Sequence, residues 1–129
     1  MAHDYRLMRE DRGWVCLNEV RLRLRFPPGI CGMLAAKCTN SATLTDLLVF
    51  GKRFTGPEAL SSKLVDGVCP AADLVENSIL LAEGRIGPEQ FDRASVKTMK
   101  VDLYKNAYAE LTNKFGFDSL ELLSPTSSL

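Results

Sequence analysis

The sequence has few of the residues that most metal sites and nucleophilic enzymes use. It contains one histidine, His3, and four cysteines without a Cys-x-x-Cys pair. This pattern argues against a metal site such as zinc and against a disulfide framework, so we expect buried, reduced thiols. A histidine-activated serine or cysteine is also disfavoured, because that base must lie within the fold and His3 is near the start of the sequence. Acid–base chemistry in this chain would therefore use a carboxylate.

The sequence also lacks an excess of charge of either sign, and it lacks long apolar runs. Its 16 Lys and Arg residues balance 16 Asp and Glu residues. Without a one-signed field, nucleic acid and anionic membranes are poor default partners, and the arginines at 21, 23 and 25 are expected to form a solvated strand edge. The longest apolar runs, such as residues 79–82, are far too short for a membrane span. Residues 1–12 are rich in charge and do not resemble a signal peptide.

Two strands are predicted at the start of the chain, over residues 5–8 and 14–24, with a polar turn between them. In the second segment, alternation would place Glu19 on one strand face with the three arginines. The pair Pro27-Pro28 ends the segment, because proline cannot donate to a strand ladder. A two-stranded sheet is marginally stable alone, so its missing partners are expected in sequence that this chain does not have.

Helices are predicted over most of the remaining sequence. Thr55 is expected to cap one of them, with Glu58 at the capping-box position, and Gly51 is expected to close the helix before it. The longest predicted helix has an apolar stripe that needs a surface to bury against, made by Val96, Met99, Leu103, Ala107 and Leu111. The expected elements are helices over residues 29–38, 44–50 (capped by Ser41 or Thr43), 55–63, 71–83 and 88–112, a short strand over 64–69, a further turn or two over 115–123, and a loose tail over 124–129.

Three segments of the sequence resemble the crotonase superfamily of acyl-CoA enzymes. They are H-D-Y-R-L-M-R-E-D-R-G-W-V-C-L-N-E-V at residues 3–20, L-L-V-F-G-K-R-F-T-G-P-E-A-L-S-S-K-L-V-D-G-V at 47–68, and K-V-D-L-Y at 100–104. The second is the most specific, and together they extend the resemblance from residue 3 to about residue 111. The resemblance implies a helix-rich α/β fold, the C-terminal part of a crotonase-type ββα spiral with an incomplete N-terminal sheet. Residues 1–26 would be the strands that carry the glutamate, and residues 29–123 the mainly helical part of one partial domain.

Within the superfamily, the sequence is most similar to plant-type peroxisomal Δ3-Δ2-enoyl-CoA isomerases. Glu19 and Pro27 keep the eight-residue spacing of those isomerases, whereas residues 28–32 are an imperfect match to a run found in the hydratases. Arg23 and Arg25 stand where relatives have glycine and proline. Family members are also longer at the N-terminus, and that part normally supplies the spiral core, most of the coenzyme A site and both oxyanion-hole donors.

The resemblance also implies which residues carry the chemistry. Glu19 would be the proton shuttle, and Leu24, Phe26, Pro27 and Lys100 would bind the acyl-CoA substrate, with no metal and no cofactor beyond the coenzyme A thioester itself. Judged from residue type alone, Glu19 fits an ion-paired structural carboxylate, and Lys100 fits a solvated lysine equally well.

Two functions stay open at this point. The chain is expected to be an enoyl-CoA isomerase of fatty acid β-oxidation, weak or inactive in this short form, with a hydratase as a variant of that interpretation. The alternative is a non-catalytic remnant that associates with copies of itself or with longer relatives, because the family usually forms trimers. The terminal Ser127-Ser128-Leu129 resembles a peroxisomal address of the S-K-L class.

Overall fold

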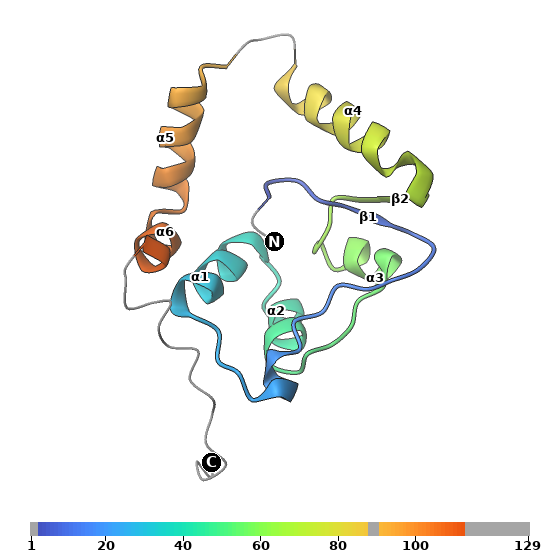
Figure 1. Cartoon of the computed structure of the whole chain (residues 1–129), viewed down its shortest axis with the longest axis vertical. Helices are drawn as coiled ribbons and strands as arrows, with labels where there is room; N and C mark the ends of the chain where they lie inside the picture. The colour runs from blue at the N-terminus through green and yellow to red at the C-terminus, as the bar shows by residue number, and fades with distance from the viewer. Residues whose placement is uncertain (1–2, 88–90, 113–129) are drawn as a thin grey trace.

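The computed structural model describes residues 3–87 and 91–112, and Figure 1 shows a helix-rich chain with one small sheet. Strands β1 and β2 pair in parallel, with Leu7 opposite Gly67 and Arg9 opposite Cys69. The helix-rich α/β class with an incomplete sheet is confirmed. In chain order the elements are β1 (Leu7–Arg9), the 3-10 turn η1 (Glu19–Leu22), α1 (Pro28–Lys37), α2 (Ser41–Leu48), α3 (Gly56–Ser61), β2 (Gly67–Cys69), the 3-10 turn η2 (Ala71–Asp73), α4 (Leu74–Ile86), α5 (Arg93–Leu103) and α6 (Lys105–Thr112).

The strand predicted over residues 14–24 is wrong. Only an isolated antiparallel bridge between Val15 and Phe54 forms there, and the chain then turns into η1. The turn closes when the Leu24 N–H donates to the carbonyl of Glu19 at 2.9 Å, with Arg23 in the left-handed region at φ 56°. A strand needs a neighbour along its whole length to pair its backbone groups, and this segment has one for a single residue pair. Glu19 therefore shares no strand face with the arginines.

The helix ends follow local side-chain chemistry. At α3, the Thr55 N–H donates to Glu58 Oε2 at 2.9 Å, which confirms the predicted capping box. At α2 the predicted caps are wrong, because Asn40 accepts a 3.1 Å hydrogen bond from the Thr43 N–H. An asparagine oxygen satisfies a free helix donor as well as a hydroxyl does, and it lies one residue earlier.

The single helix predicted over residues 88–112 is divided into α5 and α6 at Tyr104, and the longest helix in the described residues is α4. The break changes the chain direction so that α6 lies against α1 (Figure 1). Ala107 on α6 is therefore 4% exposed, whereas Met99 and Leu103 on α5 are 69% and 70% exposed. Only part of the predicted stripe is buried. The segments predicted over 115–123 and 124–129 lie outside the described residues.

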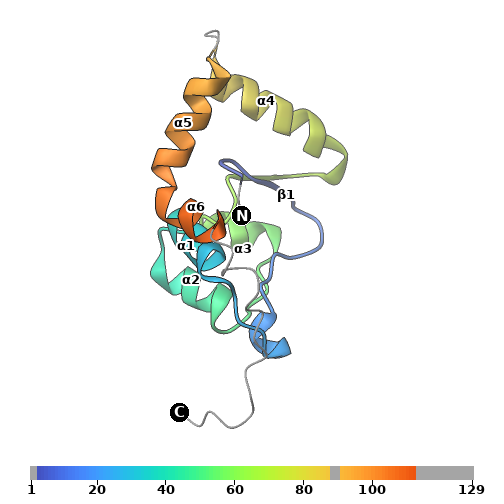
Figure 2. The same ribbon diagram turned by 60° about the vertical axis from the view of Figure 1, so that its left-hand side comes forward.

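The core lies between the sheet, α2 and α3. Leu47, Ala59 and Leu64 are fully buried and Phe54 is 1% exposed. All four cysteines are free, but only Cys38 is buried, so the expectation of buried thiols holds for one of them. Figure 2 shows α4 and α5 as two arms that extend beyond this core. The buried core residues thus lie between positions 38 and 65, and α4 and α5 contribute no buried side chain to the core.

Candidate functional site

Glu19 lies at the first position of η1, where the chain leaves the core. The turn is held by its own backbone, with the Arg21 N–H donating to the Asn18 carbonyl and the Leu24 N–H to the Glu19 carbonyl, both at 2.9 Å. One carboxylate oxygen, Oε2, is buried and has no hydrogen-bond partner among the described residues. A carboxylate with a free oxygen can accept a proton from a bound molecule. None of the ion pairs in the described part of the chain includes Glu19, so the structural, ion-paired interpretation gains no support.

The residues predicted to bind substrate beside Glu19 lie on the segment that joins η1 to α1. Leu24 and Phe26 are half-buried, and Pro27 is buried. The Pro27 carbonyl accepts hydrogen bonds from the N–H groups of Ile30 and Cys31, at 3.0 and 3.2 Å, and so begins α1. The structure therefore places three of the predicted binding residues within one short segment next to Glu19. Their contact with a substrate stays a prediction.

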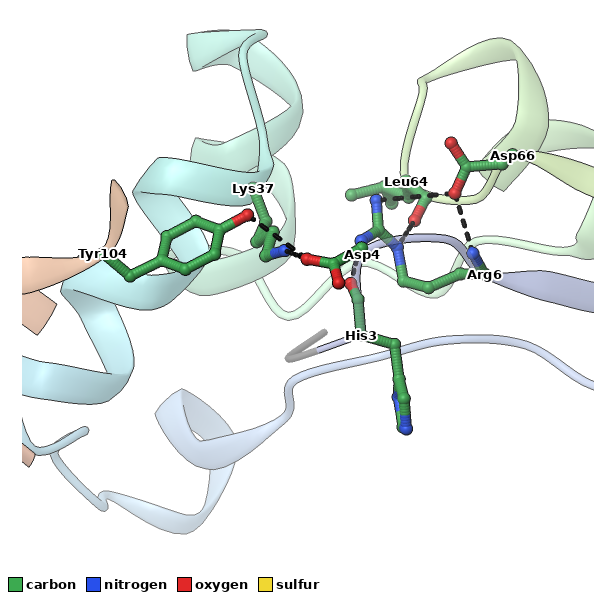
Figure 3. A network of polar contacts seen from close by, with 7 residues as sticks. All are labelled: His3, Asp4, Arg6, Lys37, Leu64, Asp66 and Tyr104. Carbon is green, nitrogen blue, oxygen red and sulfur yellow. Dashed lines mark hydrogen bonds and ion pairs between the residues drawn. The ribbon is translucent and has the colours of Figure 1, made fainter. Parts of the chain in front are cut away.

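Lys100 is not brought to this segment. It lies on α5, on the far side of α1 from the Glu19 turn in both Figure 1 and Figure 2. Its ammonium group forms an ion pair with Asp4, and the same carboxylate accepts a 2.9 Å hydrogen bond from Lys37. Tyr104 lies beside them, with its ring 4.3 Å from the Lys37 nitrogen (Figure 3). Lys100 thus connects α5 to the N-terminal segment, while its side chain stays 54% exposed.

The polar contacts of Asp4 change its titration. Hydrogen bonds from Lys100 and then Lys37 lower the pKa of Asp4 to about 2, against the opposing effect of burial. Both bonds stabilise the charged carboxylate, so it stays ionised through the neutral range. Asp4 therefore joins the N-terminal segment, α1 and α5 by charge.

An apolar groove that the sequence did not reveal lies along α5 and α6. Its volume is about 770 Å³, and it contains none of the predicted residues near Glu19. The carboxylate and the groove are thus separate features of the described chain. Only Val96 and Leu111 of the predicted apolar stripe line the groove, so the stripe was only a partial sequence signal for it. The groove is lined by Met33, Ile86, Phe91, Arg93, Val96, Lys97, Lys100, Val101, Tyr104, Tyr108 and Leu111.

Within residues 3–87 and 91–112, no three histidine, cysteine or acidic side chains gather in a way that could hold a metal ion. No helix of this part combines the length and apolarity that a membrane crossing requires. The expectation that the chain uses no cofactor stays a prediction.

The fold and the sequence can now be compared with known proteins. The structure matches human mitochondrial delta3-delta2-enoyl-CoA isomerase with a TM-score of 0.74 and 22% identity, over 89% of this chain and 43% of that one. It matches an enoyl-CoA hydratase of Mycobacterium ulcerans with a TM-score of 0.70 and 16% identity, over 91% and 48%. The described residues therefore have the fold of about the C-terminal half of a crotonase-superfamily protein.

Within that superfamily, the sequence is similar to plant enoyl-CoA delta isomerases. It is 30% identical over 125 residues to the peroxisomal enoyl-CoA delta isomerase 2 of Arabidopsis thaliana, covering 97% of this chain and 51% of the relative. The chain thus spans about half the length of that curated relative. No protein-family model matches the sequence. The resemblance to the crotonase superfamily is confirmed by these matches, which cover about the C-terminal half of the relatives.

Proposed function

We propose that the chain carries the proton-transfer half of an enoyl-CoA isomerase site, with Glu19 as the base. The observation that supports this most directly is the buried Glu19 oxygen without a partner in the described residues. The similarity of nearly the whole chain to a plant enoyl-CoA delta isomerase supports the substrate class, a 3-enoyl-CoA.

The reaction moves a double bond along an acyl thioester. Glu19 would take a proton from C2, the electrons would move to the thioester oxygen as an enolate, and the same carboxyl would return the proton to C4. One carboxylate is sufficient if it reaches both carbons. Leu24, Phe26 and Pro27 would then bound the acyl chain beside it, since they lie on the segment that follows the turn.

The 129-residue chain alone is expected to be a weak isomerase. The enolate oxygen needs preorganised N–H donors, and the loss of one such donor typically costs about 10²–10³ in rate. By the resemblance, both donors belong to the half of the family fold that this chain does not match. A general base alone contributes only about 10²–10⁴.

The assay is conversion of a 3-enoyl-CoA to the conjugated 2-enoyl-CoA, followed by ultraviolet absorbance. We expect slow turnover in the wild type, loss of it in Glu19→Gln, and no change in Glu83→Gln, which alters an exposed glutamate of α4. Equal rates in Glu19→Gln and wild type would exclude Glu19 as the base. Loss of absorbance when a 2-enoyl-CoA is supplied would instead indicate hydration and favour the hydratase interpretation.

A second candidate function is a non-catalytic association partner of copies or longer relatives. The exposed apolar side chains of α4 and α5, such as Val75 at 73% and Leu103 at 70%, favour it. The two candidates are separated by the assay above, because an association partner would show no turnover that depends on Glu19.

We also propose a peroxisomal location, since the matching enoyl-CoA delta isomerases 1 and 2 of Arabidopsis thaliana are named as peroxisomal. The candidate address Ser127-Ser128-Leu129 lies outside the described residues. A fluorescent reporter that ends in the C-terminal segment of this chain, with Ser127-Ser128-Leu129 as its last residues, should collect in puncta with a peroxisomal marker. A diffuse signal that deletion of the tripeptide does not change would contradict the address.

A further inference from the structure

The side chain of Glu19 has no polar anchor of its own in the described structure. Its Oε2 is buried without a hydrogen-bond partner, and no ion pair between described residues includes it. A carboxylate held by hydrogen bonds would be oriented by them. Here the position of the carboxylate depends instead on the backbone of the turn that carries it, so whatever holds that backbone also places the acid.

The loop that follows α2 contacts the turn on both sides of Glu19. Gly51, in this loop, is buried and has a φ of +56°. A Cβ at this position would lie 3.3 Å from the Leu17 carbonyl oxygen and 3.3 Å from Val20 Cγ1. Leu17 precedes Glu19 by two residues and Val20 follows it by one. The absence of a side chain at position 51 therefore lets the loop approach the turn closely. Figure 1 shows η1, in blue, beside the end of α2.

Three hydrogen bonds attach the segment before Glu19 to the same loop. The Cys16 thiol donates to the Gly51 carbonyl, with 3.3 Å between sulfur and oxygen. One residue earlier, Val15 and Phe54 exchange two backbone hydrogen bonds of 2.9 Å each. Phe54 is 1% exposed and belongs to the core. The loop is thus anchored in the core through Phe54, and the segment that leads into the Glu19 turn is hydrogen-bonded to this anchored loop.

We propose that Gly51, together with Cys16, positions Glu19 for proton transfer. Gly51 sets the distance between the loop and the turn, and the Cys16 thiol fixes the chain direction just before the turn. The catalytic consequence depends on the proposed isomerase function, whereas the placement of the Glu19 side chain does not. Gly51 and Cys16 are positioning residues, since neither is required to touch the substrate.

The first test is Gly51→Ala, compared with Gly13→Ala. Gly13 also has a positive φ, +90°, but nothing in the described structure lies within 4 Å of an added Cβ there. Both variants therefore add a Cβ at a backbone position with positive φ. Only Gly51→Ala brings that Cβ against the Glu19 turn. In Gly51→Ala we expect a changed carboxyl ¹³C resonance for Glu19, assigned with Glu19→Gln. We also expect amide hydrogen exchange about tenfold faster at Leu24, whose N–H bonds to the Glu19 carbonyl. Gly13→Ala should change neither.

The second test replaces Cys16. It can support or overturn the positioning proposal even if Gly51→Ala does not fold. Cys16→Ala removes the donor to Gly51, whereas Cys16→Ser keeps an O–H donor there. We expect the Glu19 resonance and the Leu24 exchange rate to change in Cys16→Ala and to return toward wild type in Cys16→Ser. Unchanged values in Cys16→Ala and in any folded Gly51→Ala would overturn the proposal.

Activity separates this proposal from the proposed function. If Glu19→Gln abolishes the isomerase turnover of the wild type, kcat should fall about 10- to 100-fold in Gly51→Ala with KM within about twofold, because misplacement acts on the chemical step. A change in KM alone would contradict positioning. If turnover does not depend on Glu19, the isomerase proposal fails, and the resonance and exchange measurements still decide whether Gly51 places the side chain.

Discussion

Asp4 shows how one carboxylate can join distant parts of this chain. Its Oδ1 accepts from Lys37 Nζ at 2.9 Å and from the Tyr104 hydroxyl at 3.5 Å, and Lys100 binds the other oxygen. The Lys37 side chain is only 6% exposed, so its charge needs this partner (Figure 3). Four side chains from the N-terminal segment, α1 and the α5–α6 region thus share one small network.

Asp4→Asn should lower the free energy of unfolding by about 1 kcal/mol, a modest value because the Asp4 side chain is 34% exposed. The folded-state pKa of Asp4 is about 2, below its usual value. A lowered pKa gives stability that is present above the unfolded-state pKa and is lost as the pH falls toward 2. Wild-type stability should therefore decline between about pH 4 and 2 more steeply than that of Asp4→Asn.

Urea unfolding at a series of pH values measures this difference. Asp102→Asn is the matched control, because Asp102 lies exposed on α5 and forms none of the ion pairs found between described residues. If the free energy of unfolding falls equally steeply with decreasing pH in wild type and Asp4→Asn, the network does not stabilise the fold.

At the scale of single helices, α3 depends on its N-terminal cap. Glu58 Oε2 accepts from both the N–H and the hydroxyl of Thr55, at 2.9 and 2.8 Å. The same bonds, from the backbone and then the side chain of Thr55, lower the pKa of Glu58. The cap fixes the start of a helix whose Ala59 is fully buried in the core.

Glu58→Ala should therefore destabilise the protein by about 1 kcal/mol, since it removes the acceptor of the Thr55 N–H and hydroxyl at the N-cap of α3. Glu83→Ala is the matched control, because it makes the same change in α4 at an exposed position. Thermal unfolding followed by circular dichroism should show a midpoint lower by about 3 °C in Glu58→Ala only. Equal midpoints in both variants would refute a stabilising cap.

The elements that could be predicted from the sequence are those whose signals are local. The helix predicted over residues 29–38 is found as α1, and Thr55 with Glu58 predicted the start of α3. Residues 14–24 were predicted wrongly because alternation shows which side chains could share a face but does not supply a neighbouring strand. The break at Tyr104 was missed for a similar reason, since it follows from the packing of α6 on α1.

The candidate site was predicted only in part. The resemblance selected Glu19 and the segment up to Pro27, and the structure places these residues together. Lys100 was assigned to the same substrate, which stays a prediction, and the structure pairs its ammonium group with Asp4, 96 positions earlier in the chain. No local pattern links two residues so far apart. The support that Gly51 gives the Glu19 turn also depends on a contact between distant segments.

For the whole molecule, the distribution of apolar surface predicts association. Val75 on α4 is 73% exposed, and Met99 and Leu103 on α5 are 69% and 70% exposed. Large exposed apolar areas mark surfaces that other protein covers. The purified chain should therefore self-associate as its concentration rises through the micromolar range, as measured by sedimentation velocity.

Replacing Val75, Met99 and Leu103 together by serine should shift the protein toward monomer. Glu76→Gln, at another exposed position of α4, should leave the association unchanged. A wild-type chain that stays monomeric throughout the concentration series would contradict this prediction.

The close approach of α1 and α6 has a consequence for how the chain folds as it is made. A Cβ at Gly29 would lie 2.6 Å from Leu111 Cγ, so the two helices meet almost backbone to backbone. The bond from Tyr104 to Asp4 spans 100 positions, and the bond from Arg6 to Asp66 spans 60. Such non-local closures slow folding, because the entropy of a long loop is lost before its contacts form. During synthesis, the contacts of Asp4 and Arg6 therefore cannot form until the chain has been extended by 100 and 60 further residues.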